Sequence, residues 1–373
     1  MNAHPKRDRF VGIGLLLLLA VLVAVGFWKV GPGRAEERVA VETRPERVMG
    51  TECLLAATVR RRNIPSAERA LGEAEAVLRR VEAKMSSWLA ESEISRLNRA
   101  EAGEPVALSA ESIAVLRLAR DAVEPTGGAF DATCRPLIEL WREAARADRL
   151  PSDEQIAAAR GSSHWDQVEL DDRTATKRDA TAQVDLGGIA KGHAIDRALA
   201  AVRAAGVEGG LVDVGGDVAV FGKPPKGSVW PVEVRNPFGP GVLTRLQIVE
   251  GAVCTSGDYA RGRMIEGRRY SHIIDPRTGR PARSAPSVTV MAPDAVTADI
   301  WATALSVLGP EGLERLPGDV EAILIKGSES DYKTYCTPGV FDLLESALPG
   351  KPMAVYKKTH HEGHEGYEEG DSR

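Results

Sequence analysis

The chain has 373 residues, of which 43% are hydrophobic, 27% charged and 5% aromatic, and it contains 37 Gly, 22 Pro and four Cys. This composition excludes a disordered chain, a disulfide-rich scaffold and a collagen-like repeat. The 48 basic and 53 acidic residues leave a formal net charge of −5, so there is no overall positive field to attract nucleic acid. We therefore expect no nucleic-acid partner, and local groups would have to hold any anionic ligand.

The N-terminus combines a basic cluster with an apolar segment. Lys6, Arg7 and Arg9 precede residues 11–28, which carry no charge and would span about 27 Å as a helix, close to the hydrocarbon thickness of a bilayer. The basic residues predict that residues 1–10 stay in the cytoplasm and that the following chain is exported. A cleaved signal peptide is the alternative, but no A-x-A site follows the segment. We favour an uncleaved single-pass anchor in the inner membrane, with the rest of the chain on the periplasmic side.

Composition also divides the exported part of the chain. Residues 29–47, rich in Gly, Pro, Arg and Glu, are predicted to form a tether. Residues 348–373, which end in a His-, Glu- and Gly-rich stretch without apolar periodicity, are predicted to form a disordered tail. The four cysteines are widely spaced and form no C-x-x-C pair, so we interpret them as structural. Residues 48–347 remain as one folded domain.

The folded region mixes helices and strands without strict alternation. The spacing of apolar residues predicts helices over 66–81, 109–123, 189–205 and 294–308. Short runs of β-forming residues predict strands over 167–170, 183–186, 210–214, 218–221, 230–234, 244–249, 287–291 and 321–326. Because helices and strands do not alternate one for one, the sequence favours the α+β class over a doubly wound parallel sheet.

A glycine-rich turn joins the predicted strand 183–186 to the helix that follows it. Gly187 and Gly188 would let the backbone approach a ligand closely, and the N–H groups at the start of the helix would favour an anion. Lys191 adds a positive charge. The spacing matches neither G-x-G-x-x-G nor G-x-x-x-x-G-K-[ST], so neither a Rossmann nor a Walker site is supported. The residues alone support a structural turn and a ligand site equally.

An acidic residue stands on an otherwise apolar predicted helix. Asp294 is the predicted N-cap of this helix and Gly309 its end. Asp299 and Thr303 are four residues apart and would project from the same face. A buried carboxylate needs a partner, and carboxylate and hydroxyl oxygens suit Mg²⁺ or Ca²⁺ better than Zn²⁺. The alternative is an exposed helix face on which Asp299 is simply solvated.

A histidine precedes a predicted turn. Segments 254–259 and 270–279 are predicted to form a hairpin, and its turn begins at Asp275. His272 has the chemistry of a general base near neutral pH, although a structural role is the alternative. Arg277 is either a phosphate contact or a surface charge, and the sequence alone leaves this open.

Eight short motifs occur in a fixed order along residues 48–347. They are 49–51; 85–88 with 92–98; 128–131 with 136–137 and 141; 184–192; 215–217; 255–259; 272–279; and 298–299 with 303. Together they resemble the FAD:protein FMN transferase family, also called the ApbE-like flavin transferases. The chain departs from the family pattern at Trp88, where tyrosine is frequent, and at His193, where an aromatic residue is common. Neither departure removes a metal ligand that the resemblance implies.

The resemblance implies a single ApbE-like, T-fold-type catalytic domain after the membrane helix. It implies an enzyme that cleaves the pyrophosphate of FAD, joins the FMN half to a Thr or Ser hydroxyl of an exported acceptor flavoprotein, and releases AMP. Family members use Mg²⁺ and modify subunits such as those of membrane electron-transfer complexes. Two alternatives remain open: an FAD pyrophosphatase that yields free FMN and AMP, and a non-catalytic, membrane-anchored FAD-binding protein.

The resemblance also implies roles for individual residues. Asp299, Thr303 and the carbonyl of Gly188 would bind the metal. His272 would be catalytic, with Asp258 or Asp275 as orienting alternatives. The positions at which the family contacts FAD, several of them through backbone atoms, are Met49, Trp88, Ala129, Phe130, Asp131, Asp185, Lys191 and Ile273.

Overall fold

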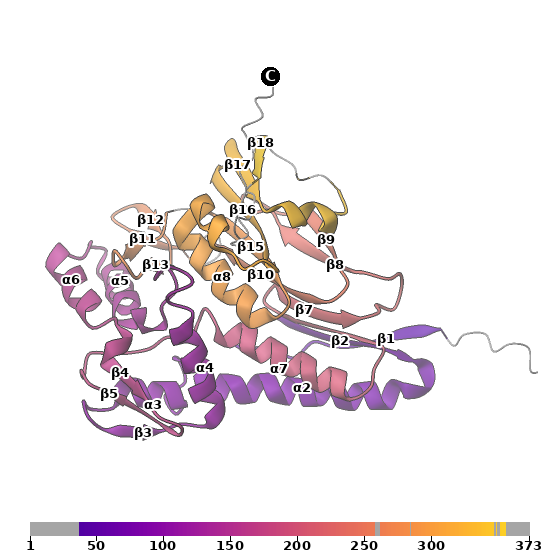
Figure 1. The fold of residues 1–373 in the computed structure, drawn as a ribbon, viewed down its shortest axis with the longest axis horizontal. Coiled ribbons are helices and arrows are strands. Elements are labelled where there is room, and N and C mark those ends of the chain that lie inside the picture. The colour runs from indigo at the N-terminus through magenta and orange to yellow at the C-terminus, as the bar shows by residue number, and fades with distance from the viewer. Residues whose placement is uncertain (1–36, 258–261, 284, 347, 349–350, 356–373) are drawn as a thin grey trace, which may run out of the picture.

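The computed structural model describes residues 37–257, 262–283, 285–346, 348 and 351–355 (Figure 1). The predicted cytoplasmic segment 1–10 and the predicted membrane anchor 11–28 lie outside these residues, as do residues 29–36 of the predicted tether and most of the predicted tail. Within the described ranges, no helix is both long and apolar enough to cross a membrane.

A nine-stranded sheet forms the centre of the described fold. Neighbouring strands pair antiparallel, apart from the last two in the spatial order, which pair parallel. In spatial order the strands are β1 (Arg38–Thr43), β2 (Cys53–Arg60), β6 (Gly209–Val214), β7 (Asp217–Gly222), β10 (Gly251–Gly257), β15 (Ser287–Ala292), β16 (Glu321–Ser328), β17 (Asp331–Cys336) and β18 (Lys351–Val355).

Both edges of this sheet lie outside the predicted domain. β1 falls within residues 29–47, which the composition assigned to a tether, and β18 falls within residues 348–373, which it assigned to a disordered tail. β1 pairs with β2 along its whole length, and Val39 and Val41 pack against the main core. These short segments gain order from backbone pairing with strands distant in sequence, which local composition does not record.

Helices α2 (Ile64–Met85), α7 (Ala190–Ala204) and α8 (Ala295–Leu308) cover one face of the sheet (Figure 1). Their apolar stripes form the main core with the inward side chains of the strands. α7 packs against α2 and α8. Gly192 permits the close approach of α7 to α8, because a Cβ at this position would clash with the backbone carbonyl of Ala295. This crossing brings the glycine-rich turn before α7 next to α8.

A hairpin of β8 (Trp230–Arg235) and β9 (Val242–Ile248) covers the opposite face of the sheet. Alternate residues of β8, namely Trp230, Val232 and Val234, are buried, as expected for a strand with one face on a core. The hairpin packs on sheet residues such as Val220 and Val253 and forms a second, separate core. The fold is therefore layered as helices, sheet and hairpin, and the α+β class is confirmed.

Smaller elements complete the fold. The helices α5 and α6 form a third core with two short hairpins, and a three-stranded sheet has the order β3-β5-β4. These elements are η1 (Arg61–Asn63), α3 (Glu93–Arg99), β3 (Pro105–Ala107), α4 (Ala110–Asp121), η2 (Ala132–Cys134), α5 (Arg135–Ala147), α6 (Asp153–Gly161), η3 (Trp165–Gln167), β4 (Val168–Leu170), β5 (Thr174–Lys177), β11 (Arg263–Ile265), β12 (Arg268–Tyr270), β13 (Ile274–Asp275), β14 (Arg280–Pro281), η4 (Gly309–Arg315) and η5 (Pro338–Leu343).

Two sequence-based predictions of pairing are wrong. Segment 183–186 is not a strand, and its backbone is held by a side chain. Segments 254–259 and 270–279 do not form a hairpin with one another, because β10 pairs with β7 and β15 in the central sheet. The predicted turn that begins at Asp275 is present, however, and β13 and β14 flank it.

The Asn98 side chain makes hydrogen bonds to segment 183–186 of the kind that a neighbouring strand would make. Its Nδ2 donates to the carbonyl of Val184 and its Oδ1 accepts from the N–H of the same residue, both at 2.8 Å. Lys177, itself buried, donates from Nζ to the Asn98 carbonyl at 3.0 Å. Buried backbone groups need such partners. Asn98 therefore fixes the backbone immediately before Asp185.

Replacing Asn98 with alanine should lower the free energy of unfolding by about 2–4 kcal/mol, because it leaves two buried backbone groups of Val184 unpaired. Denaturant unfolding monitored by circular dichroism measures this loss. Asn63→Ala is the matched control: the Asn63 side chain is exposed and makes no capping hydrogen bond within the described chain, so we expect a change within about 0.5 kcal/mol. Equal stability of the two variants would contradict this role for Asn98.

Candidate functional site

The site is organised by the N-terminus of α7. The helix begins at Ala190, directly after the glycine-rich turn. The N–H of Gly192, in the first turn of α7, donates to Asp299 Oδ2 of α8 at 3.0 Å. A helix N-terminus favours negative charge, which explains why a carboxylate is tolerated at this place. The hydrogen bond joins two motifs that lie 107 residues apart in sequence.

The Asp299 carboxylate is buried, with 4% of the residue exposed. The alternative of a solvated Asp299 on an open helix face is therefore wrong. Burial raises the pKa of Asp299, while the Lys191 ammonium and the Gly192 N–H act in the opposite direction. A second positive charge close to this carboxylate would offset more of the cost of its burial.

Gly188 and Thr303 meet beside this carboxylate. A Cβ at Gly188 would lie 2.8 Å from Thr303 Oγ1 and 3.1 Å from the ring of Phe130, so only glycine fits here without displacing them. Thr303 lies one helical turn after Asp299 on α8. The structure thus brings together all three residues predicted as metal ligands. The described part of the chain holds no cluster of three or more His, Cys, Asp or Glu side chains suited to a metal, so a cation here would depend on one carboxylate and neutral oxygens. This donor set suits a hard cation such as Mg²⁺, which keeps several waters or phosphate oxygens as ligands.

Lys191 faces the start of β7. Its ammonium forms an ion pair with Oδ2 of Asp217, which is buried. Asp217 Oδ1 accepts a hydrogen bond of 2.8 Å from the N–H of Thr255 on β10. Of the two partners, Lys191 is the partly exposed one, so its side chain is the part of the ion pair that a ligand beside the N-terminus of α7 would meet. The motifs 184–192, 215–217 and 255–257 meet at this ion pair.

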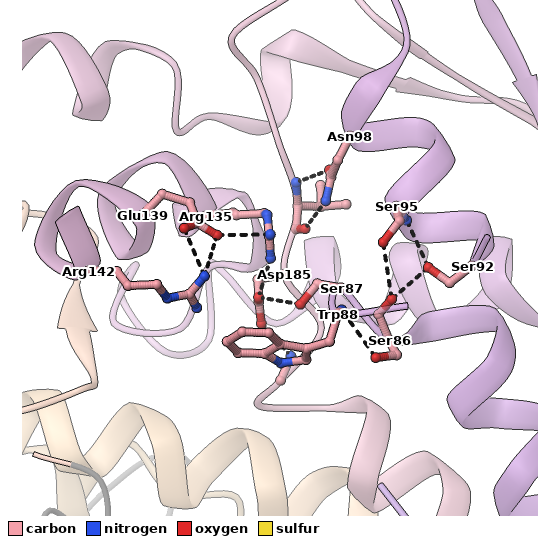
Figure 2. A network of polar contacts seen from close by, with 12 residues as sticks. Ser86, Ser87, Trp88, Ser92, Ser95, Asn98, Arg135, Glu139, Arg142 and Asp185 are labelled. Carbon is pink, nitrogen blue, oxygen red and sulfur yellow. Dashed lines mark hydrogen bonds and ion pairs between the residues drawn. The ribbon is translucent and has the colours of Figure 1, made fainter. Parts of the chain in front are cut away.

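Asp185 is held from three sides, as Figure 2 shows in part. Its Oδ1 accepts from the N–H of Gly187 at 2.8 Å, and its Oδ2 accepts from Ser87 Oγ and from Arg135 Nη1, both at 3.0 Å. These bonds tie the glycine-rich turn to the end of α2 and to the start of α5. Asp185 therefore shapes the turn.

Trp88 is the most exposed large hydrophobic residue of the described chain, with 74% of its surface accessible. It follows the end of α2, and its backbone N–H donates to Ser86 Oγ at 3.2 Å. The guanidinium of Arg142, on α5, lies 4.4 Å from the centre of the indole (Figure 2). An exposed aromatic ring beside Asp185 is suited to stacking on a planar ligand.

The motif 128–131 lies between the glycine-rich turn and the turn that follows His272. Ala129 and Phe130 are buried, and Phe130 touches Gly188. Asp131 Oδ1 accepts from the N–H and the hydroxyl of Thr133 at 2.8 and 2.7 Å, which caps η2, and burial raises the pKa of the Asp131 carboxyl. The side chain of Asp131 thus holds the loop, which leaves its backbone for any contact with a ligand.

Met49 lies in a tight turn between Val48 and Thr51, with a φ of 51°. Left-handed backbone is uncommon for residues other than glycine and points to a tightly specified turn. Thr51 packs on Gly215, where a Cβ would lie 2.7 Å from its Oγ1. This places the predicted FAD contact Met49 next to the motif 215–217.

His272 and Ile273 lie between β12 and β13 and are half-buried. The N–H of Ile273 donates to Ser271 Oγ at 3.0 Å, and its carbonyl accepts from the N–H of Ala282 at 2.9 Å. The chain segment on which His272 lies is therefore fixed by the hydrogen bonds of the Ile273 N–H and carbonyl. Asp258, one of the orienting alternatives to His272, lies outside the described residues.

Asp275, the other alternative, is engaged by its own turn. Arg277 donates from Nε and Nη2 to its two carboxylate oxygens, both at 2.9 Å, and the N–H of Arg277 donates to Oδ1 at 3.0 Å. The side chain of Arg277 also lies against Gly128. Arg277 is thus a turn partner, and Asp275, with both oxygens paired, is a weak candidate for proton transfer. The contact of Arg277 with Gly128 places segment 272–279 beside the motif 128–131.

Sequence reasoning gave no role to several residues that build this site. Asp217 and Ser87 stand inside or next to recognised motifs, so their polar side chains were a usable signal. Arg135 and Arg142 also stand next to motif residues, but their partners could not be inferred from sequence, because only the packing of α5 brings them to Asp185 and Trp88.

Known proteins share this fold. Among the solved structures of similar fold, Flavin Transferase ApbE from Vibrio cholerae has a TM-score of 0.71 at 29% identity, covering 83% of this chain and 99% of that one. The apo form of the Pseudomonas stutzeri flavinyl transferase ApbE has a TM-score of 0.72 at 27% identity, covering 84% and 99%. The family model described as the ApbE family matches residues 49–324. This chain belongs to the ApbE family.

Curated relatives carry the name FAD:protein FMN transferase. The protein from Vibrio cholerae is 33% identical over 272 residues, which are 71% of this chain and 81% of the relative. The protein from Treponema pallidum is 33% identical over 351 residues, which are 87% of this chain and 93% of the relative.

Proposed function

We propose that this chain is a Mg²⁺-dependent FAD:protein FMN transferase, which moves the FMN part of FAD to a Thr or Ser hydroxyl of an acceptor flavoprotein and releases AMP. The observation that carries this proposal is the buried Asp299 carboxylate at the N-terminus of α7, beside Gly188, Thr303 and Lys191. A helix N-terminus with a nearby ammonium group suits a pyrophosphate, and the adjoining oxygen donors suit a hard cation. The names of the curated relatives support the same reaction.

The residues that would hold Mg²⁺ are Asp299, Thr303 and the carbonyl of Gly188. Bound there, the cation would neutralise charge on the pyrophosphate during phosphoryl transfer. Lys191, fixed by Asp217, would add a positive charge on the same side of α7. The chain itself therefore supplies the anion-binding groups, which a protein of net charge −5 lacks over its surface as a whole.

His272 would act as the general base. It would take the proton from the acceptor hydroxyl, whose oxygen then forms a bond to the phosphorus of the FMN half. The bond between that phosphorus and the bridging oxygen breaks, and AMP leaves with the bridging oxygen. One phosphoester thus replaces one phosphoanhydride, and the hydroxyl proton passes to the histidine. Binding of FAD would involve Met49, Trp88, Ala129, Phe130, Asp131, Asp185, Lys191 and Ile273.

The acceptor would be an exported protein. The basic cluster before residues 11–28 supports an anchor in the inner membrane with the catalytic domain on the periplasmic side. An acceptor subunit of a membrane electron-transfer complex, or a related FMN-binding domain, would meet the enzyme on that side.

The test is to incubate the purified full-length chain with FAD, Mg²⁺ and a flavoprotein acceptor domain, and to measure the mass of the acceptor. A gain of one FMN with release of AMP supports the transferase. Free FMN and AMP with an unmodified acceptor would identify a pyrophosphatase instead. Intact FAD that stays bound to the chain would identify an FAD-binding protein.

Replacing Gly188 with alanine should lower the transfer rate at least about tenfold, because the added methyl group would displace Thr303 Oγ1 and the Phe130 ring. The free energy of unfolding should fall by about 1–3 kcal/mol from overpacking. Initial rates at varied Mg²⁺ concentration measure the first effect. Gly72→Ala on α2 is the control, since a Cβ there would meet no described atom within 4 Å. An unchanged Mg²⁺ requirement in Gly188→Ala would contradict the proposed ligand set.

A further inference from the structure

We propose that Arg142 is a positioning residue for FAD: it backs one face of the Trp88 indole and thereby orients the other face to stack on a planar ring of FAD. The inference rests on the proposed function, because that function makes FAD the ligand. It assigns a role to a side chain of α5 that none of the recognised motifs contains.

The first observation is the geometry at Trp88. A ring that is 74% exposed gains little from burial in the free protein, so packing alone does not explain its position. Its one ring contact within the described chain is the Arg142 guanidinium, 4.4 Å from the ring centre and within the range of a cation–π interaction. The opposite face of the indole is left for a ligand.

The second observation is that Arg142 is itself fixed. Its Nη1 donates to both carboxylate oxygens of Glu139 at 2.7 and 2.8 Å, and only 17% of its side chain is exposed. Glu139 also pairs with Arg135 at 2.9 Å, and Arg135 pairs with Asp185 at 3.0 Å. Figure 2 shows this row of contacts, which runs from the indole to the glycine-rich turn. A side chain held in this way loses little entropy on binding, so the platform is preorganised.

The third observation is the second guanidinium next to Arg142. Burial and the neighbouring Arg142 guanidinium lower the pKa of Arg263 on β11. Nη1 of Arg263 is buried and makes no hydrogen bond to any described residue. Guanidinium groups beside an exposed ring suit a ligand that carries both a planar ring and a pyrophosphate, as FAD does.

The test measures the affinity of the full-length chain for FAD without Mg²⁺, by titration in the presence of a chelator. Arg142→Gln should raise the Kd for FAD about three- to tenfold, with kcat at saturating FAD changed less than twofold. Arg142→Lys keeps the positive charge but not the planar guanidinium over the indole, and should recover part of the loss. Arg146→Gln, one turn later on the exposed side of α5, is the matched control and should bind like the wild type.

A double-mutant cycle separates positioning from a general effect on stability. If Arg142 acts through the indole, Arg142→Gln should change the Kd less than twofold in a Trp88→Ala background. Independent, multiplicative effects of the two substitutions would overturn the proposal. A Kd that is unchanged or lowered in Arg142→Gln would also overturn it, since the guanidinium would then have no influence or would occupy the stacking face. If Arg142→Gln does not fold, the same double-mutant cycle with Trp88→Ala is measured using Arg142→Lys.

The wild-type titration keeps the two proposals apart. A wild-type chain that does not bind FAD contradicts the proposed function itself. A wild-type chain that binds FAD, together with an Arg142→Gln variant of equal affinity, contradicts only the role of Arg142.

Discussion

Replacing Asp299 with asparagine should abolish Mg²⁺-dependent flavin transfer while the protein stays folded. The amide oxygen can still accept the Gly192 N–H, which Asp299 Oδ2 accepts at 3.0 Å, so the link between α7 and α8 survives. The charge that would hold the cation is lost. Mutating a residue that hydrogen-bonds to a metal ligand already lowers metal affinity or activity about 10- to 100-fold. We therefore expect the loss of Asp299, a proposed ligand itself, to lower the rate more than about 100-fold. The free energy of unfolding without metal should not fall, because the substitution removes a buried charge.

Two measurements check this expectation: the initial rate at saturating FAD over a range of Mg²⁺ concentrations, and the unfolding temperature with and without Mg²⁺. The wild type should be stabilised by the cation and the variant should not. Asp294→Asn is the control on the same helix, because Asp294 caps α8 through the N–H of Thr297 at 2.8 Å and asparagine caps equally well. Normal activity in Asp299→Asn would remove Asp299 from the proposed metal site.

Replacing His272 with alanine should lower kcat by about 100- to 10,000-fold, the usual contribution of a general base. The Kd for FAD should change little, because the proposed role of the ring is to take a proton from the acceptor hydroxyl. Segment 272–279 should keep its conformation, since its turn is held by the bonds of Arg277 to Asp275 and by the backbone of Ile273.

Single-turnover transfer and FAD titration, measured on the same preparation, separate the two effects. His164→Gln serves as the control, since His164 is exposed at the start of η3. If His272→Ala transferred FMN at the wild-type rate, the role of base would pass to a carboxylate. Asp258 would then be the better candidate, because Arg277 already occupies both oxygens of Asp275.

The sequence predicted the helices of the main core better than the segments around the site. α8 has the predicted cap at Asp294 and ends at Gly309, because capping and apolar spacing are local properties of the chain. Segment 183–186 looks like a strand locally but pairs with the Asn98 side chain, a contact with a residue more than 80 positions away. β1 and β18 were missed for the same reason, since their order comes from pairing with distant strands.

The sequence by itself determined the order of the motifs, their resemblance to a family of flavin transferases, and the donor chemistry of Asp299 and Thr303. Only the tertiary structure decided that Asp299 is buried at the N-terminus of α7, that Lys191 pairs with Asp217, and that Arg142 backs Trp88. Whether a residue is buried or paired depends on residues far apart in the chain, so a local sequence pattern does not record it. The net charge of −5 illustrates the difference: the total is set by composition, whereas the positive groups at the site are gathered by the fold.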